Sequence, residues 1–362
     1  MTTAIPVTRT THSRLATYDF QKIVFGANPT DHMFLADYQG GAWRRPRIEP
    51  FGDLTLSPLA LCLHYGQTVF EGFKAYRQAD GNVSLFRPDR HHARLNRSLE
   101  RMCMPAIPGE LFRTAVRRLV ALEEPWVPHR ADASLYLRPF VIATEPRLGV
   151  KVADSYLFGI VCLPLAHYYS GHLRVKVETE FVRAVEGGAG AAKCGGNYGA
   201  AFYPAQQAKE QGFDQLLWTD ALHHEYIEES GTMNVMFVLD EVLVTPPLSG
   251  SILDGVTRDS LLTLARDGGI QVEERRISYK ELEQAFRSGR RVEAFGVGTA
   301  AAVSPIGEID INGHRYFPDV SAGTVFARLQ SELQDIRLGQ KADPYHWNDL
   351  IRVKEGSEQE AG

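Results

Sequence analysis

Lys193 lies within a run of residues with small side chains, Gly187-Gly188-Ala189-Gly190-Ala191-Ala192-Lys193-Cys194-Gly195-Gly196-Asn197-Tyr198-Gly199. Glycine lets another group approach the backbone closely, as a flat ring must. A lysine amine becomes a nucleophile when burial and a nearby cation favour loss of its proton. The run is therefore compatible with a lysine that binds a planar cofactor covalently. Taken alone, the pattern more often marks an ordinary loop lysine, so its interpretation depends on the rest of the sequence.

The same glycines could belong to a dinucleotide-binding fingerprint, because Gly188 and Gly190 begin a G-x-G pattern. Such a fingerprint follows a strand, opens a helix and is followed by an acidic residue about 20 positions later. Here the glycines precede a lysine among small residues. A nicotinamide-dependent oxidoreductase is therefore the less favoured alternative, and nicotinamide-dependent absorbance would identify it.

Three further segments offer groups that suit a phosphorylated pyridine cofactor. Glu228 and Glu229 precede an apolar run, and a carboxylate facing a pyridine nitrogen keeps that nitrogen protonated. We interpret Glu228 itself as part of a solvated acidic turn. The segment Gly255-Val256-Thr257-Arg258 opens a predicted helix, whose free N–H groups could bind phosphate. The segment Gly296-Val297-Gly298-Thr299-Ala300 is a second loop of this kind, and both could serve one phosphate together with an arginine.

The composition is that of an ordinary globular enzyme. The chain has 362 residues, of which 44% are hydrophobic and 23% charged, which predicts two domains. The net charge of −5 and the lack of a basic stripe argue against a nucleic-acid partner. The four cysteines have neither disulfide nor zinc spacing, so no metal site is expected and a reducing cytoplasm is predicted.

The termini and the apolar runs predict no association with a membrane. The N-terminus lacks the basic and apolar regions of a secretory signal, and residues 1–15 are interpreted as a frayed tail rather than a transit peptide. The longest apolar run, Tyr156–Ala166, is too short to span a bilayer.

Periodicity predicts helices and strands in irregular succession, which favours the α+β class. A break at Ser170-Gly171 suggests the boundary between domains. We expect a small N-terminal domain over 1–170 with an extension over about 1–35, a linker over 171–180 and a large cofactor-binding domain over 181–362. The predicted strands are Val83–Phe86, Ser134–Ala143, Tyr156–Leu163, Arg174–Glu178, Asn234–Val238 and Val242–Thr245, the last two as a hairpin. The predicted helices are Asp89–Met102, Leu111–Leu122, Thr257–Ala265 and one that starts at a Ser278/Glu281 capping box and is ended by Gly289.

Several motifs in one order resemble those of branched-chain aminotransferases, which belong to the fold-type IV class of pyridoxal-phosphate enzymes. The resemblance runs from about Asp37 to Asn348. Besides the lysine stretch, it rests on Tyr65-Gly66-Gln67-Thr68-Val69-Phe70-Glu71-Gly72-Phe73-Lys74-Ala75-Tyr76, Ser134-Leu135-Tyr136-Leu137-Arg138-Pro139, Glu229-Ser230-Gly231-Thr232-Met233-Asn234 and Gly298-Thr299-Ala300. It implies a fold-type IV transaminase with pyridoxal 5′-phosphate between its two domains.

The resemblance implies a role for each matching position. Lys193 would hold pyridoxal phosphate and shuttle the proton, Glu229 would face the pyridine nitrogen, and Tyr198 would bond the ring's phenolic oxygen. The phosphate would be bound by Arg94, Val256, Thr257 and Thr299. The backbone of Thr299 and Ala300 would bind the α-carboxylate of the substrate.

A substrate pocket and a second subunit are also implied. The aromatic wall would consist of Tyr65, Phe70, Tyr136 and Tyr168. Leu148 and Val150 resemble a loop that enters the partner's site, so a homodimer is expected. Arg138 is our candidate for the second carboxylate of glutamate, because an arginine fork suits a carboxylate; the alternative is a structural ion pair.

The implied reaction is a two-step exchange in which leucine, isoleucine or valine becomes a 2-oxo acid and 2-oxoglutarate becomes L-glutamate. The closest rivals are a D-amino-acid aminotransferase and an aminodeoxychorismate lyase. A non-catalytic pyridoxal-phosphate carrier is a further alternative, which turnover would exclude.

Overall fold

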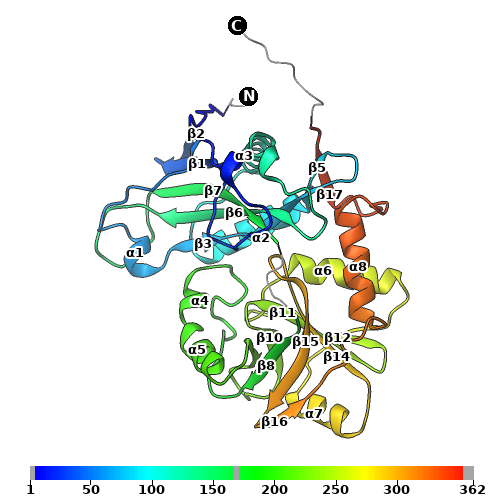
Figure 1. The fold of residues 1–362 in the computed structure, drawn as a ribbon. Helices are drawn as coiled ribbons and strands as arrows, with labels where there is room; N and C mark the ends of the chain where they lie inside the picture. Colours follow the sequence, from blue (N-terminus) through cyan, green and yellow to red (C-terminus); the bar gives the residue numbers. More distant parts are fainter. Residues whose placement is uncertain (1–4, 167–170, 354–362) are drawn as a thin grey trace.

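The first sheet forms the upper half of the molecule in Figure 1. In the computed structural model, which describes residues 5–166 and 171–353, this sheet has eight antiparallel strands in the order β17-β5-β4-β6-β7-β1-β2, with β3 paired to β6. The strands are β1 His32–Gln39, β2 Ala42–Pro50, β3 Thr68–Phe70, β4 Phe73–Arg77, β5 Val83–Phe86, β6 Ser134–Ala143, β7 Tyr156–Leu165 and β17 Asn348–Ile351.

Two amphipathic helices pack on this sheet, α2 (Pro88–Arg101) and α3 (Gly109–Leu122). Leu95 and Leu99 of α2 recur at the helical period and are fully buried, as are Phe112 and Leu119 of α3. These side chains join the inner face of the sheet in one apolar core. The short helix α1 (Cys62–Tyr65) and the 3₁₀ turns Leu15–Thr17 and Glu124–Trp126 complete this half of the molecule.

The N-terminal segment is ordered against the first sheet, so the interpretation of residues 1–15 as a frayed tail is wrong for residues 5–15. Ile5 is buried in the core, and Val7 forms a bridge with Ile48. The backbone N–H of Thr10 donates to His32 at 2.9 Å. The few apolar residues that anchor this stretch, Ile5, Val7 and Leu15, do not recur at a helical or strand period, so the sequence carries no periodic signal there.

The second sheet closes on itself into a barrel below the first sheet (Figure 1). Its order within the described residues is β10-β9-β8-β15-β14-β11-β12-β13, and an extra pairing between β10 and β11 closes the ring. Strand β16 pairs with β15. The bounds are β8 Leu173–Glu178, β9 Gln215–Thr219, β10 Ile227–Ser230, β11 Met233–Leu239, β12 Val242–Thr245, β13 Val272–Glu274, β14 Val292–Gly298, β15 Ala302–Ile311 and β16 His314–Tyr316.

Five helices surround the barrel in the part of the chain that the structure describes. They are α4 Gly196–Gly199, α5 Phe202–Glu210, α6 Val256–Asp267, α7 Tyr279–Arg287 and α8 Val325–Arg337. Leu261 of α6 and Phe326 of α8 share a buried cluster with Phe295 of β14, which fixes both helices beside the barrel. Because α6 is fixed in this way, the position of its N-terminus is also set.

The predicted α+β class is confirmed, and the predicted strands and helices are present with small shifts of their ends. The hairpin of β11 and β12 is antiparallel, as expected. Only one of the two contacts of the predicted capping box is present. Ser278 does cap α7 by accepting from the N–H of Lys280, but Glu281 pairs with Arg275. The Arg275 guanidinium binds the Glu281 carboxylate, which in a capping box would accept a hydrogen bond from the backbone N–H of Ser278.

The proposed domain bounds stay a prediction, and two features bear on them. The expected linker 171–180 contains strand β8, which pairs with β9 and β15 of the barrel. Strand β17 follows the barrel in sequence but pairs with β5 of the first sheet. The chain therefore passes between the two sheets twice.

Candidate active site

A cavity of about 470 Å³ lies between the two sheets. Its walls come from β3, the turn at Gly72, β6 and α2 on one side and from the barrel, the lysine stretch and the start of α6 on the other. Eleven of the predicted site residues line it: Phe70, Arg94, Tyr136, Arg138, Lys193, Tyr198, Glu229, Val256, Thr257, Thr299 and Ala300.

Hydrogen bonds hold the backbone of Lys193 to helix α2 and to strand β3, and they position the Lys193 amine in the cavity. The N–H of Lys193 donates to Ser98 Oγ of α2 at 2.9 Å, and its carbonyl accepts from the N–H of Phe70 at 3.0 Å. A Cβ at Gly195 would lie 2.5 Å from Thr68 Oγ1, so glycine is required for this approach. Lys193 Nζ lies 2.9 Å from the hydroxyl of Tyr198.

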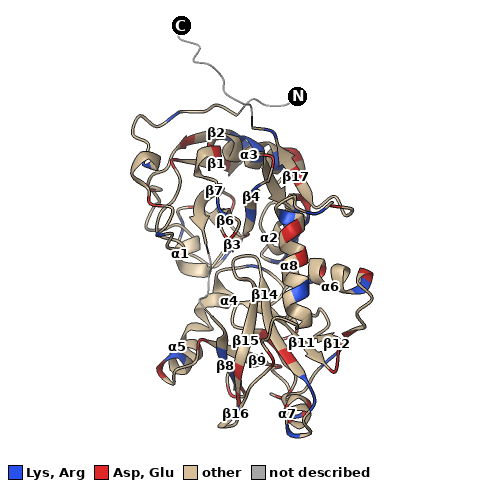
Figure 2. Cartoon of the chain, turned by 45° about the vertical axis from the view of Figure 1, so that its right-hand side comes forward, with Lys and Arg blue, Asp and Glu red and all other residues tan. Residues whose placement is uncertain are grey.

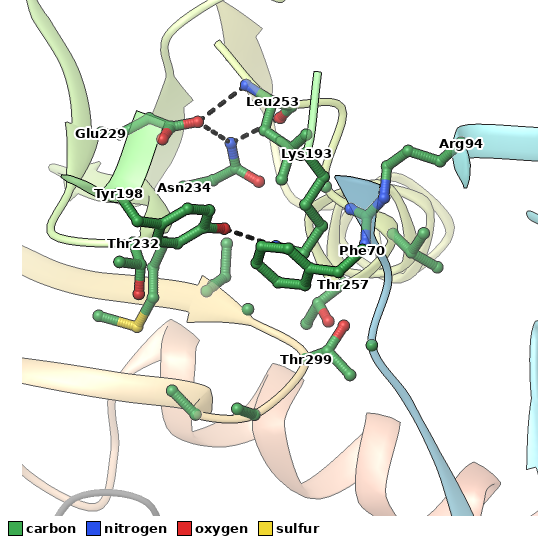
Figure 3. A pocket seen from close by; sticks show the side chains of 18 of the residues that line it. Phe70, Arg94, Lys193, Tyr198, Glu229, Thr232, Asn234, Leu253, Thr257 and Thr299 are labelled. Atoms are coloured by element: carbon green, nitrogen blue, oxygen red, sulfur yellow. Dashed lines mark hydrogen bonds between the residues drawn. The ribbon is translucent and has the colours of Figure 1, made fainter. Parts of the chain in front are cut away.

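Glu229 lies on one side of Lys193 in Figure 3, at the end of strand β10. Its Oε1 accepts from the backbone N–H of Leu253 at 2.9 Å and from Asn234 Nδ2 at 3.2 Å. Its Oε2 lies 2.9 Å from Arg183 Nε. Burial raises the pKa of Glu229, and the Arg183 guanidinium opposes that rise. The two hydrogen bonds and the ion pair fix the orientation of this carboxylate within the cavity.

Arg94 lies on the other side of Lys193 in the same view (Figure 3). Both oxygens of Glu71 contact its guanidinium, with Nε–Oε2 at 2.8 Å and Nη2–Oε1 at 2.5 Å. Its Nη1 donates to the carbonyl of Asp254 at 3.0 Å. Arg94 is therefore held from behind by an acid while it lines the cavity, and the pKa of Glu71 is strongly lowered by Arg94 against the effect of burial.

The first turn of α6 borders the same end of the cavity. Val256 and Thr257 are its first two residues, and within the described residues no side chain caps this turn. Uncapped N–H groups at a helix start attract an anion. Thr299, which follows the end of β14, adds a hydroxyl to the lining of the cavity (Figure 3).

An aromatic wall encloses the part of the cavity nearest the first sheet. Arg138 Nη2 donates to the hydroxyl of Tyr136 at 3.0 Å, and its guanidinium lies 4.6 Å from the ring centre of Phe70. A Cβ at Gly72 would lie 1.9 Å from the Tyr136 hydroxyl, so Tyr136 can stand there only beside glycine. The alternative role of Arg138 as a structural ion pair has no acidic partner among residues 5–166 and 171–353.

Three of the predicted substrate residues that the structure describes do not line this cavity. Tyr65 ends α1 and is exposed. Leu148 and Val150 lie in the loop between β6 and β7, with exposed fractions of 59% and 86%. Tyr168 lies outside the described residues. An isolated chain therefore leaves the β6–β7 loop unpartnered.

The interpretation of Glu228 as a solvated turn residue is wrong. Glu228 belongs to β10 and is half-buried, and it accepts a hydrogen bond from Ser251 Oγ at 2.6 Å. Burial raises its pKa. The short strand contains two adjacent acids that point to opposite faces, because side chains alternate along a strand. Only Glu229 faces the cavity.

Sequence reasoning missed three residues that orient the predicted ones, namely Glu71, Arg183 and Asn234. Glu71 stands in a quoted motif, and a buried charge between two apolar strands signals a partner of opposite charge. Arg183 precedes the glycine run without any recognisable spacing, and its contact with Glu229 arises because β9 pairs both with β8, which precedes Arg183, and with β10. Nothing local to Arg183 could have revealed it.

The arrangement fits pyridoxal phosphate by its donor set. A guanidinium, an uncapped helix start and a hydroxyl gather at one end, and together they suit a phosphate. A buried carboxylate on the other side suits a protonated pyridine nitrogen, with a lysine amine between them (Figure 3). The residues present therefore fit both ends of this cofactor.

Comparison with known proteins agrees with this chemistry. The family described as "Amino-transferase class IV" matches residues 68–309. A branched-chain-amino-acid transaminase of Bacillus subtilis is 49% identical over 91% of this chain and 94% of its own. The branched-chain amino acid aminotransferase of Escherichia coli has a TM-score of 0.71 at 27% identity, over 88% of this chain and 98% of that one.

A further solved structure comes from a thermophilic archaeon. The branched-chain aminotransferase of Thermoproteus uzoniensis, solved with norvaline, has a TM-score of 0.72 at 26% identity, over 88% of this chain and 99% of that one. The matched profile, the relatives and the order of the motifs lead to one family. The chain belongs to the class IV aminotransferases and, within them, to the branched-chain aminotransferases.

Proposed function

We propose that this protein is a branched-chain-amino-acid transaminase, which uses pyridoxal 5′-phosphate to exchange the amino group of L-leucine, L-isoleucine or L-valine with 2-oxoglutarate. The products are the 2-oxo acid and L-glutamate. One observation carries the proposal: the Lys193 amine, 2.9 Å from the Tyr198 hydroxyl, stands between a buried carboxylate and an anion-binding helix start in a single cavity.

The cofactor would be held by Lys193, Arg94, Tyr198, Glu229, Val256, Thr257 and Thr299. When bound, pyridoxal phosphate supplies an aldehyde carbon for covalent attachment and a pyridinium ring that accepts electrons. Arg94 and the first turn of α6 would bind the phosphate, and Tyr198 would donate to the phenolic oxygen. Glu229 would hold a proton at the ring nitrogen, and its own orientation is fixed by Leu253, Asn234 and Arg183.

Lys193 also moves the proton of the reaction. In this role the Lys193 amine would remove the proton from the substrate Cα as general base, and would hold it for return as general acid. The hydroxyl of Tyr198 keeps the amine within reach. The hydrogen bonds of the Lys193 N–H and carbonyl hold its backbone in place, so that only its side chain moves. This supports proton transfer along the same path in each turnover.

The substrate side combines an apolar wall with anchors for carboxylates. The backbone N–H groups of Thr299 and Ala300 bind the α-carboxylate, and Phe70 and Tyr136 accept a branched aliphatic side chain. Arg138, which lacks an acidic partner in the described chain, binds the second carboxylate of glutamate. Tyr65 and Tyr168 complete the wall under this proposal.

A homodimer is proposed as the working form, with Leu148 and Val150 of one subunit at the other subunit's cavity. The exposure of these two apolar side chains in one loop supports a covering partner. A cytoplasmic location is proposed because all four cysteines are free thiols, which suits a reducing compartment. No helix in the described chain is long and apolar enough to cross a bilayer.

The charge distribution supports small-molecule substrates. In Figure 2, basic and acidic segments are interspersed over the visible face. Amino acids and 2-oxo acids are the partners that the cavity suits, and nucleic acid is not proposed as one.

The decisive experiment follows the visible spectrum of the purified holoenzyme. L-Leucine should bleach the yellow colour and 2-oxoglutarate should restore it, because these are the two halves of the exchange. Lys193→Ala, the control, should show neither change. Bleaching with D-alanine alone would assign the chain to the D-specific relatives. A protein that stays colourless after the cofactor is added would contradict the whole proposal.

A further inference from the structure

A second cavity, of about 640 Å³, lies behind the turn that closes the active site. Ala300 and Ala301 line both cavities, so the same turn separates them. The second cavity is bounded by β4, by the start of β15 and by α8. Nothing in the proposed transamination uses it.

Two buried cations line this second cavity, Lys74 of β4 and Arg337 at the end of α8. Their exposed fractions are 8% and 3%. Lys74 Nζ donates to the carbonyl of Ala300 at 3.0 Å. The Arg337 guanidinium lies 4.5 Å from the ring centre of Phe86 and 5.7 Å from that of Tyr76, and it has no ion pair with a described residue.

Neither cation has a carboxylate partner in residues 5–166 and 171–353, and this sets them apart from comparable residues. Arg94 and Arg258 are equally buried, but each has an acid close by, Glu71 and Glu274 respectively. A buried charge without a partner is costly, because water no longer solvates it. Two such charges on one cavity indicate a site for an anion.

The other charged groups at this cavity do not neutralise the pair. Asp132 forms an ion pair with Arg130, and within the described residues no ion pair joins Asp335 to either cation; His172 also lines the cavity. Burial and the neighbouring Arg337 lower the pKa of Lys74 to about 7. An anion between the two cations would reverse that repulsion and keep Lys74 protonated, and so strengthen its bond to the Ala300 carbonyl.

The rest of the lining selects the kind of anion. Tyr76, Val303, Pro305 and Leu333 present apolar surface next to the two cations. An arginine fork matches the two oxygens of a carboxylate. A cavity of this size holds a small organic molecule. We propose that the cavity between β4, β15 and α8 is a second ligand site, which binds a small carboxylate with a short apolar chain through Lys74 and Arg337.

The number of ligand sites tests this proposal independently of turnover. Isobutyrate is a suitable probe, because it has neither an amino nor an oxo group to react. Calorimetric titration of the holoenzyme should give two isobutyrate sites per chain, one of them in the active site. Isobutyramide, the neutral counterpart, should not fill the second site. One isobutyrate site per wild-type chain, or equal filling by the amide, would overturn the proposal.

Substitution at Arg337 locates the second site. Arg337→Met should bind one isobutyrate per chain with the active-site affinity unchanged, because methionine fills similar space without charge. Arg328→Met, on the exposed part of the same helix, is the matched control and should keep two sites. Two sites in Arg337→Met would refute the assignment.

A crystal structure of the wild-type holoenzyme with isobutyrate decides the matter even if Arg337→Met does not fold. The carboxylate should lie within hydrogen-bonding distance of Lys74 Nζ and the Arg337 guanidinium. Isobutyrate in the active site alone, at a concentration that saturates it, would contradict the proposal. Neither measurement needs catalysis, so its outcome is separate from that of the proposed transamination.

Discussion

Glu71 holds Arg94 through both carboxylate oxygens, at 2.8 Å from Nε and 2.5 Å from Nη2, and both side chains are buried. His91 adds a third contact, with its Nδ1 3.2 Å from Glu71 Oε1. The guanidinium that lines the proposed phosphate end of the cavity is thus oriented by an acid that does not line it. Glu71 is a positioning residue in this arrangement.

Glu71→Gln should weaken the binding of pyridoxal phosphate at least about tenfold. The reason is that Arg94, which would bind the phosphate, loses the carboxylate that orients its guanidinium. The variant should also lose about 3–5 kcal/mol of unfolding free energy, as a buried charge loses its partner. Spectroscopic titration measures the affinity. Pyridoxal, which lacks the phosphate, is the control ligand and should bind both proteins alike. An equal loss for pyridoxal would show that Glu71 does not act through the phosphate.

Glu229→Gln should lower kcat by about 10²- to 10⁴-fold, since glutamine cannot hold a proton at the ring nitrogen. The adjacent Glu228→Gln is the matched control, because its side chain bonds Ser251 and does not line the cavity. Steady-state rates with L-leucine and 2-oxoglutarate measure both. Equal rates for the two variants would remove Glu229 from its assigned role.

Arg138→Met should impair the glutamate half of the exchange and spare the leucine half. A hydrogen bond to a charged group contributes about 1.5–3 kcal/mol, so kcat/KM for glutamate should fall about 10- to 100-fold. Single-turnover spectra with each amino acid give the ratio. If glutamate turnover stays as good as leucine turnover, Arg138 does not bind the second carboxylate.

The free energy of unfolding should rise with pH above about 7, because Lys74 is buried. Burial lowers its pKa in the folded protein to about 7 from 10.5, so the unfolded chain binds more protons between these values. Between pH 7 and 9 the wild type should gain about 2 kcal/mol relative to Lys74→Met. Denaturation by urea at both pH values measures this. Lys209→Met, an exposed position on α5, should show no such difference.

Val150→Asp should raise the KM for leucine without lowering the unfolding temperature of the subunit. An exposed side chain contributes within about 0.5 kcal/mol to stability, whereas in the proposed dimer a charge at the partner's apolar pocket would repel the substrate chain. Val24→Asp, also exposed and apolar, is the control. An unchanged KM would place the β6–β7 loop away from the partner's site.

The predictable part of this molecule is local in sequence. The lysine stretch, the start of α6 and the Thr299-Ala300 turn could be recognised because each is a contiguous segment with its own backbone chemistry. The strands and helices followed from periodicity, since core positions repeat at fixed spacing.

The remainder depends on contacts between distant segments. Arg183 reaches Glu229 because β9 pairs both with β8, which precedes Arg183, and with β10, which contains Glu229. The prediction of a solvated turn at Glu228 is wrong because a short strand with two adjacent acids has the composition of a polar turn. The cation pair of Lys74 and Arg337 comes from β4 and α8, which no local pattern connects.

Strand β17 has a consequence for the order in which the chain can fold during synthesis. It covers the edge of β5, although roughly 180 residues separate it from β7, and a ribosome adding about 5–20 residues per second needs on the order of ten to forty seconds for them. Throughout that interval β5 presents unpaired backbone groups, and an open strand edge is where nascent chains aggregate. Production of this protein should therefore benefit from slow expression at low temperature, because fewer unfinished chains are then present together.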